Sequence, residues 1–197
     1  MAYYKKIEID MEQLFIPIVA GTIRPKRRSF NVAKLVHQVA EKLPEVESQL
    51  LDPNDFNMPF DGNDEENKDP KYSEISTRAD AFFLVIPEYN HGYPGTLKRF
   101  MDSELKNYVH KPVAFAGVSN GPWGGVRAIE AFVPSAREMG LVVTHTDVNF
   151  PFVSKLFDEE GKLLDEAYIP RIERAYKELI WMAKTLKWGR HNLEQNS

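Results

Sequence analysis

The sequence of 197 residues contains no cysteine. This absence excludes disulfides, thiol nucleophiles, cysteine-ligated zinc and iron–sulfur clusters, and it fits a reducing compartment. The N-terminus, MAYYKKIEIDMEQ, lacks the apolar core and the small-residue cleavage site of a signal peptide. No apolar run approaches the roughly 18–20 residues that span a bilayer. We therefore expect a cytoplasmic protein without a membrane partner.

An excess of basic charge is also missing, since the formal net charge is −4. Proteins that bind nucleic acid normally carry a basic stripe, so we expect no nucleic-acid partner. The histidines show no metal-ligand spacing, so we expect no metal site and assign no catalytic histidine; they are His37, His91, His110, His145 and His191. Hydrophobic residues make up 43% and charged residues 27% of the chain, which is typical of a globular protein.

Short apolar runs alternate with stretches of helical spacing along the chain. The runs at 14–20, 46–51, 81–86, 112–118 and 141–143 predict five strands. We expect the first strand to begin at or near Pro17, because proline cannot donate to a sheet ladder. The run at 81–86 has no polar alternation, which is typical of a strand buried on both faces of a parallel sheet. The pattern predicts one α/β domain with helices on both faces of a parallel sheet.

The same reading divides the chain into an N-terminal extension (1–13), a single domain (14–190) and a C-terminal tail (191–197). Residues 52–72 are rich in proline, asparagine and aspartate and predict a long loop, which is usually functional or mobile. We expect Pro134 to kink or end the helix that follows the fourth strand. A long amphipathic helix is predicted near the C-terminus.

Three unusual loops follow strands at the carboxyl edge of the predicted sheet, where α/β proteins bind ligands. They are GTIRPKRRSFN, PEYNHGYPG and SNGPWGG. The first supplies arginines and leads directly into a helix N-terminus, whose free N–H groups attract phosphate. Alternatively, Ser29 is only a helix cap and the arginines lie in solvent. The loop contains neither a GxxxxGK[ST] nor a GxGxxG motif.

The second and third loops have the composition of a site for a flat ring. A segment such as 87–90 can present backbone N–H groups to the polar edge of a planar ring while Tyr89 packs alongside it. Alternatively, it is a plain turn with Glu88 and His91 in solvent. The glycines of the third loop permit close approach of the backbone to a ligand. Trp123 between them could cover a ring or pack against a neighbouring subunit.

Taken in this order, the three loops resemble the NADPH-dependent FMN reductase family, which is similar to flavodoxins in fold. PEYNHGYPGTLKRFMD matches the family's PEYN…PGxLKNxxD signature. GTIRPKRRS resembles its GTxRxGRxS phosphate loop, with Lys26 where the family often has glycine, and SNGPWGGVRA resembles its S-x-G-x-x-GG-x-R-A segment. The resemblance extends from about Ile16 to Trp188 and implies a flavodoxin-like three-layer sandwich with strand order 2-1-3-4-5.

The resemblance implies FMN as cofactor, NADPH or NADH as co-substrate and a small electron acceptor such as a quinone, flavin or azo compound. It makes Thr22, Arg24, Ser29 and Asn31 phosphate ligands; it places Pro87, Glu88, Tyr89 and Asn90 along the isoalloxazine; and it places Ser119, Gly121, Gly124 and Gly125 over its pyrimidine side. The cofactor carries the redox chemistry, so no catalytic side chain is assigned. An FMN-binding electron carrier of the flavodoxin type, or a redox-sensing regulatory protein without turnover, is the alternative.

We also expect a homodimer, with a tetramer as a further possibility. The motive is a set of large aromatics in glycine- and proline-rich loops, namely Tyr93, Trp123, Phe150 and Phe152. A contiguous patch of such side chains usually marks an interface, and a two-fold dimer is the commonest soluble assembly. The alternative is that these side chains stack on the flavin or fold back onto the same subunit.

Overall fold

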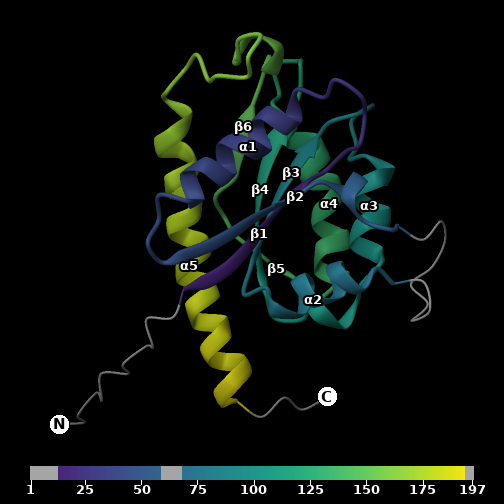
Figure 1. The fold of residues 1–197 in the computed structure, drawn as a ribbon, viewed down its shortest axis with the longest axis vertical. Coiled ribbons are helices and arrows are strands. Elements are labelled where there is room, and N and C mark those ends of the chain that lie inside the picture. Colours follow the sequence, from purple (N-terminus) through teal and green to yellow (C-terminus); the bar gives the residue numbers. More distant parts are fainter. Residues whose placement is uncertain (1–12, 59–67, 194–197) are drawn as a thin grey trace.

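A computed structural model, which describes residues 13–58 and 68–193, contains one parallel sheet (Figure 1). The strands are β1 (Leu14–Ala20), β2 (Val46–Leu51), β3 (Phe82–Pro87), β4 (Pro112–Val118), β5 (Val142–Val143) and β6 (Val148–Phe150). The sheet order β2-β1-β3-β4-β5 confirms the flavodoxin-like prediction. The predicted extension up to residue 12, and residues 194–197 of the predicted tail, lie outside the described residues.

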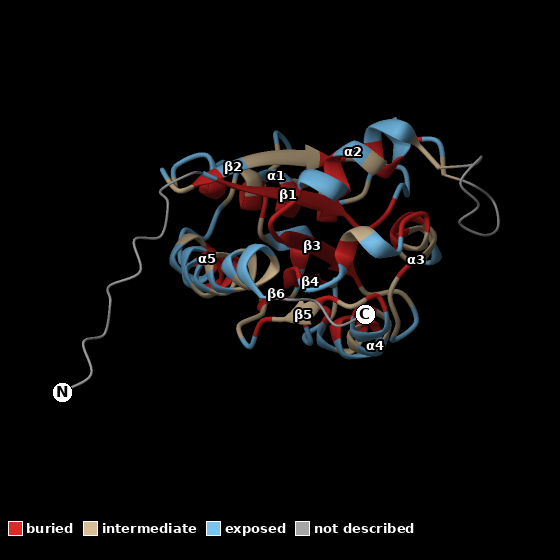
Figure 2. Cartoon of the chain, turned by 90° about the horizontal axis from the view of Figure 1, so that it is seen from below, coloured by how far each residue is buried: buried red, intermediate tan, exposed pale blue. Residues whose placement is uncertain are grey.

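Helices cover both faces of the sheet, as Figure 2 shows from below. One face is covered by α1 (Ser29–Ala40) and α5 (Tyr168–Asn192). The other is covered by α2 (Pro70–Arg78), α3 (Gly95–Asp102) and α4 (Val126–Glu138). Successive residues of β1 alternate between the two cores, with Ile16 in the first and Phe15 in the second. Because both faces are buried, the central strands need the continuous apolar runs seen in the sequence. None of the described helices is long and apolar enough to cross a membrane.

Pro17 lies inside β1, so the expectation that the strand begins there is wrong. Phe15 O accepts from Asp80 N and Gly21 N donates to Val85 O, which shows that odd-numbered residues of β1 direct their backbone groups toward β3. The N–H that Pro17 lacks therefore falls on the β3 side. Pairing with β3 begins only at Ile18, whereas pairing with β2 begins at Leu14. The proline costs no ladder bond at this position.

The region that the sequence predicts as loop 52–72 ends in a helix, α2. The helix begins at Pro70, and the side chain of Asp69 accepts from Tyr72 N at 3.0 Å as its cap. Residues 53–55 form a 3₁₀ turn. The part of this loop at 59–67 lies outside the described residues.

The strand predicted at 141–143 is present as β5, and the sheet has a sixth strand, β6, that the sequence reading missed. β5 pairs with the start of β4, and β6 pairs with its end. Phe150 therefore belongs to β6 and is fully buried, with its ring stacked on Tyr168 at 4.6 Å between centroids. Tyr93 also folds back, edge-on to Phe132 at 5.1 Å. Of the four loop aromatics, Trp123 and Phe152 alone are exposed.

Pro134 does not end its helix, since α4 continues from Val126 to Glu138. The proline removes the bond that its N–H would make to the carbonyl of Glu130. Pro134 and Glu130 are both exposed, so water can satisfy that carbonyl. Phe132 and Ala136 flank the proline and are fully buried, so packing against the sheet holds the helix together.

The amino end of the sheet is tied to α5 by Asp80, which is buried. Its carboxylate accepts from Phe15 N at 3.1 Å and from Lys187 Nζ at 3.1 Å. Arg190 Nη2 approaches its other oxygen at 3.4 Å, and Arg190 Nη1 donates to the carbonyl of His110. Burial lowers the pKa of Arg190, and the charge of Asp80 opposes that effect. One carboxylate thus joins β1, β3 and the last helix.

We expect Asp80→Ala to lower the free energy of unfolding by about 3 kcal/mol, because it removes a buried carboxylate that accepts from a strand N–H and forms ion pairs with Lys187 and Arg190. Urea unfolding followed by circular dichroism measures the loss. Glu47→Ala is the matched control, since it breaks an ion pair with Arg78 in which both side chains are 53% exposed; it should cost less than about 1 kcal/mol. Equal losses in the two variants would contradict the role of Asp80.

Candidate active site

The three loops singled out in the sequence meet at the carboxyl edge of the sheet, the upper end in Figure 1. Backbone hydrogen bonds continue the sheet beyond the ends of the strands. Gly21 N donates to Val85 O at 2.8 Å, Glu88 N to Val118 O at 2.8 Å, and Ser119 N to Phe150 O at 3.1 Å. Each loop therefore starts from a point that the neighbouring strand holds in place.

The first loop is packed tightly where it leaves β1. A Cβ on Gly21 would lie 2.4 Å from the carbonyl oxygen of Val85, so only glycine fits. Thr22 is buried, and its hydroxyl accepts from Arg24 N and from the hydroxyl of Tyr89, both at 3.3 Å. The guanidinium of Arg24 lies over the ring of Tyr89, 5.6 Å from its centroid. The first and second loops thus share a wall.

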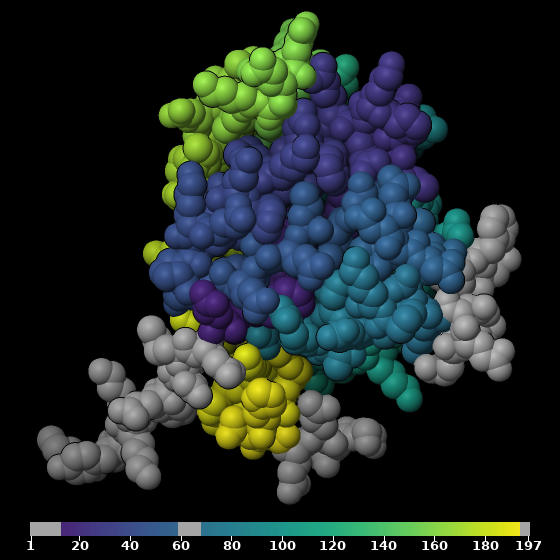
Figure 3. All heavy atoms as spheres, viewed as in Figure 1, coloured from purple at the N-terminus to yellow at the C-terminus, as the bar shows by residue number. Residues whose placement is uncertain are grey.

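The three arginines of the first loop have different surroundings. Arg27 forms an ion pair with Asp52 and lies over the ring of Phe30. Arg28 donates to the carbonyl of Asp158 at 3.3 Å. Figure 3 shows the segment after β6 (green) beside this loop (purple) at the top of the molecule. Among the described residues Arg24 has no carboxylate partner, so its charge is free to meet an anion.

The loop also presents unused backbone donors at the start of α1. The N–H groups of residues 26–29 donate to no acceptor within the described residues. Ser29 is the first residue of α1 and is buried, and no side chain caps the helix, so the interpretation of Ser29 as a helix cap is wrong. Lys26 has φ +56°, a left-handed conformation that favours glycine. Free N–H groups at a helix N-terminus are a recurrent anion site.

The second loop makes a tight reversal after β3. Tyr89 N donates to Gly92 O, and Gly92 N donates to Tyr89 O. Asn90 and His91 between them have φ of +49° and +67°, the pattern of a type I′ turn. Arg127, from the first turn of α4, donates to Glu88 Oε1 through Nε at 2.8 Å. The turn is therefore anchored by β4 below and by α4 at its side.

The third loop is seated on the backbone of β4. Gly125 has φ +87°, and a Cβ there would lie 2.3 Å from Val118 N. Gly124, with φ +59°, is packed against β6 and Pro151. These two glycines serve close packing in the structure. A Cβ on Gly121, in contrast, would meet only Ser119 Oγ, at 4.0 Å.

Two adjoining cavities open between these loops. The first cavity has a volume of about 410 Å³, and its wall includes the cationic residues of the first loop. It is lined by Arg24, Pro25, Lys26, Arg27, Arg28, Ser29, Pro87, Glu88, Tyr89, Val118, Ser119, Asn120 and Val153. A second cavity, of about 680 Å³, is lined by Thr22, Ile23, Arg24, Glu88, Tyr89, Asn90, Pro94, Gly95 and Thr96. Three residues, Arg24, Glu88 and Tyr89, belong to both. Volumes of this size hold cofactors and other small molecules.

The structure brings together eight of the twelve predicted site residues in these walls, namely Thr22, Arg24, Ser29, Pro87, Glu88, Tyr89, Asn90 and Ser119. Asn31 lies instead against the turn at Gly161, and Gly121, Gly124 and Gly125 stay outside both walls. The sequence reading missed Asn120, although it belongs to the third loop. It also missed Val153, which reaches the cavity from a 3₁₀ turn after β6 and has no motif to mark it.

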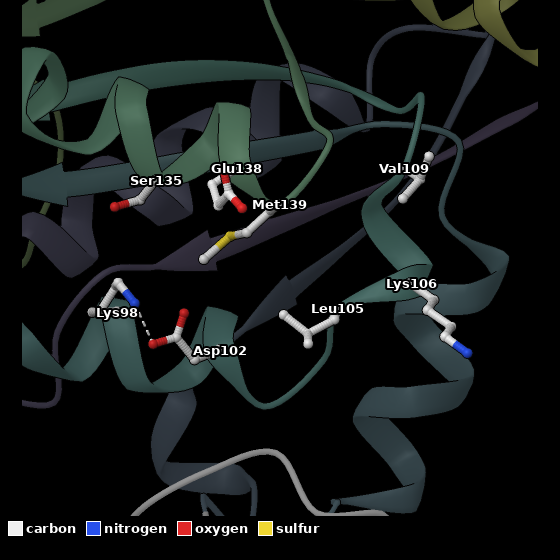
Figure 4. A pocket seen from close by; sticks show the side chains of 8 residues that line it. All are labelled: Lys98, Asp102, Leu105, Lys106, Val109, Ser135, Glu138 and Met139. Atoms are coloured by element: carbon white, nitrogen blue, oxygen red, sulfur yellow. Dashed lines mark hydrogen bonds and ion pairs between the residues drawn. The ribbon is translucent and has the colours of Figure 1, made fainter. Parts of the chain in front are cut away.

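A third cavity, of about 390 Å³, is a groove between α3 and α4 that shares no residue with the other two (Figure 4). Lys98 and Asp102 on α3 form an ion pair across one turn. Leu105 and Val109 are 46% and 41% exposed at its edge. The groove combines paired charges with exposed apolar side chains, and it lies apart from the cationic loop.

The model of the family described as NADPH-dependent FMN reductase matches residues 16–155. The chain belongs to this family. The match contains all three loops, the residues of both cavities at the carboxyl edge, most of β1, and β2 to β6. Family membership makes the protein an oxidoreductase that uses FMN, with NAD(P)H as co-substrate.

Curated relatives match most of the chain. A quinone reductase of Pseudomonas putida is 27% identical over 168 residues, which are 79% of this chain and 88% of the relative. An NADPH azoreductase of Bacillus sp. (strain OY1-2) is 27% identical over 167 residues, 82% of this chain and 88% of the relative. Their names specify different acceptors, a quinone and an azo compound.

Solved structures agree with the fold. The flavoenzyme FerB, an NAD(P)H:(acceptor) oxidoreductase from Paracoccus denitrificans, has a TM-score of 0.65 at 21% identity over 82% of this chain and 98% of its own. A flavodoxin from the domain Archaea has a TM-score of 0.55 at 14% identity, over 88% of this chain and 99% of its own. Both are similar to this chain in the doubly wound architecture.

We expect Gly125→Ala to destabilise the protein by about 3 kcal/mol, because the added methyl meets the β4 backbone and the backbone has a left-handed conformation. Gly121→Ala is the matched control in the same loop. Its added methyl would meet only Ser119 Oγ, at 4.0 Å, so a change within about 0.5 kcal/mol is expected. Thermal and urea unfolding of both variants checks this. A tolerated Gly125→Ala would show that the loop is not seated as described.

Proposed function

We propose that this protein binds FMN in the two adjoining cavities at the carboxyl edge and reduces a small acceptor, such as a quinone, an azo compound or a free flavin, at the expense of NAD(P)H. The observation that carries the proposal is a cationic cavity, rich in free N–H groups, that shares a wall with a larger polar cavity. A phosphate at one end and a flat polar ring at the other fit this division.

The phosphate belongs in the smaller cavity. The free N–H groups of residues 26–29 and the positive end of α1 favour a dianion. Arg24 adds a planar, bidentate donor that no described carboxylate neutralises. Thr22 and Ser29 are the neutral partners, and Arg27 Nε is a buried donor without an acceptor among the described residues. A bound anion could accept a hydrogen bond from this buried donor, which supports a phosphate at the cationic loop.

The ring belongs beside the second and third loops. FMN supplies the redox chemistry when it is bound, because it accepts a hydride from NAD(P)H and passes two electrons to the acceptor. Pro87, Glu88, Tyr89 and Asn90 form the rigid edge of this part of the site, and Ser119 bounds it from β4. The turn at Asn90 and the third loop hold backbone donors in fixed positions, which stabilises charge without reorganisation. The family resemblance implies Asn31 as a phosphate ligand and Gly121, Gly124 and Gly125 over the pyrimidine side of the ring. Because these four residues lie outside both cavity walls, we propose instead that they shape the loops.

Turnover separates the reductase from the two alternatives. We expect purified protein supplied with FMN to oxidise NADPH or NADH in the presence of a quinone, followed by the loss of nicotinamide absorbance. Colour and retained FMN without turnover would instead support an electron carrier or a redox-sensing regulatory protein. Failure to bind FMN at all would contradict the proposed site.

We expect Arg24→Ala to weaken FMN binding roughly 10- to 100-fold, because a charged and partly desolvated hydrogen-bond partner contributes about 1.5–3 kcal/mol. Titration of apo-protein with FMN, followed by quenching of flavin fluorescence, measures the affinity. Arg78→Ala is the control, since Arg78 pairs with Glu47 outside both cavities. An unchanged affinity in Arg24→Ala would mean that Arg27 or Arg28 binds the phosphate, or that the phosphate binds outside this loop.

A homodimer in the cytoplasm is the assembly that we propose. Trp123 and Phe152 support it, because they are 61% and 44% exposed beside the site. Leu105 and Val109 add exposed apolar surface along the α3–α4 groove. Large apolar patches on a surface usually mark an interface. The lack of cysteine is the support for the compartment.

Size-exclusion chromatography with light scattering at micromolar concentration tests the assembly. We expect about twice the chain mass of 22.7 kDa, with a tetramer as the next most common closed form. Trp123→Ala should weaken flavin retention, assembly or both, since it removes the largest exposed ring near the site. A mass equal to that of one chain would contradict the dimer.

A further inference from the structure

Glu88 is the one carboxylate among the described residues that line the two cavities. Every other lining side chain is neutral or cationic. Its side chain is 5% exposed, so the charge lies almost entirely out of water. A buried carboxylate beside a cofactor ring acts strongly on any charge that the ring gains, because the effective dielectric constant is low there.

The two oxygens of Glu88 have different surroundings. Oε1 accepts from Arg127 through Nε at 2.8 Å and through Nη2. Oε2 is buried and has no hydrogen-bond partner among the described residues. Buried polar atoms are nearly always paired, so one that is not requires an explanation. The carboxylate is therefore held by one cation alone, and Arg127 is what keeps its charge balanced.

Arg127 is itself held from the other side by His91. Arg127 Nη1 and His91 Nε2 are 2.8 Å apart. A guanidinium has no acceptor, so Nε2 accepts the bond and the proton of the neutral imidazole lies on Nδ1. His91 sits in the left-handed part of the turn at 89–92. The three side chains thus link the second loop to the first turn of α4.

We propose that Arg127 and His91 are positioning residues for Glu88: Arg127 neutralises its carboxylate, and His91 holds Arg127 in place. The Arg127–Glu88 ion pair thereby sets the reduction potential of bound FMN. The proposal rests on the FMN site described above. Reduction adds negative charge to the flavin ring system, which an unbalanced carboxylate opposes and a balanced one does not. Because Arg127 neutralises it, Glu88 can line the cavities without making FMN harder to reduce.

Removing the charge of Arg127 and removing the charge of Glu88 should shift the reduction potential in opposite directions. Arg127→Ala leaves the carboxylate unbalanced, so the ratio of reduced to oxidised FMN at a fixed potential should fall about tenfold, equivalent to about 30 mV for a two-electron couple. Glu88→Gln leaves Arg127 unbalanced, so the ratio should rise by a similar factor. The double variant removes both charges and should return close to the parent.

His91 is tested by a conservative pair of variants. His91→Ala removes the acceptor that holds Arg127, so the potential should shift in the same direction as in Arg127→Ala and by a smaller factor. His91→Gln offers an amide oxygen as acceptor and should restore the parent potential. Arg78→Ala again serves as the control for removal of an arginine from an ion pair, and it should leave the potential unchanged.

The potentials are measured by reductive titration of the FMN-loaded proteins against a reference dye, after the FMN affinity of each variant has been determined. A parent that binds no FMN would overturn the proposed site, and this inference with it. FMN binding with equal potentials in all variants would overturn the inference alone. Shifts of one sign in both Arg127→Ala and Glu88→Gln would also overturn it, because they would indicate a general loosening of the loop.

Discussion

The site depends on the parallel sheet continuing past the ends of its own strands. Gly21 N, Glu88 N and Ser119 N each donate to a carbonyl of the neighbouring strand. A parallel ladder slants its bonds evenly, so the pattern can extend a residue or two into the loops without a change of geometry. The three loops thereby begin at one level, although they lie nearly a hundred residues apart in the chain. Everything that lines the two cavities is positioned from these points.

Some of the arginines at the carboxyl edge of the sheet stabilise the structure, and others are available to bind a ligand. Arg27 is used to join the first loop to Asp52, and Arg28 joins it to the segment after β6. Arg127 balances Glu88. Among the described residues, Arg24, Lys26 and Arg28 have no carboxylate partner, and they lie beside free N–H groups at the start of a helix. The site therefore has one strongly anion-attracting end and one end where charge is balanced, which matches a cofactor that carries its charge on a phosphate.

Sequence reasoning located the strands because fully buried parallel strands need continuous apolar runs. It located the loops because glycine, proline and arginine have few other reasons to occur there together. It missed α2, in which Tyr72 and Ile75 give only a brief apolar repeat within a polar segment. It missed β6, since a strand of three residues is too short to show any period. Pro17 and Pro134 were interpreted from local rules; β1 nevertheless begins before Pro17, and α4 does not end at Pro134.

The sequence by itself determined the alternation of strands and helices apart from α2 and β6, the absence of thiol chemistry and the three loops that carry the family signature. These properties follow from residue types and their spacing, which act locally along the chain. Only the tertiary structure decided which arginine remains available, that Phe150 packs on Tyr168, and that Arg127 and His91 hold Glu88. Each of these is a contact between residues 18 to 130 positions apart in the chain. No local pattern specifies such contacts, because they depend on where the sheet brings distant loops together.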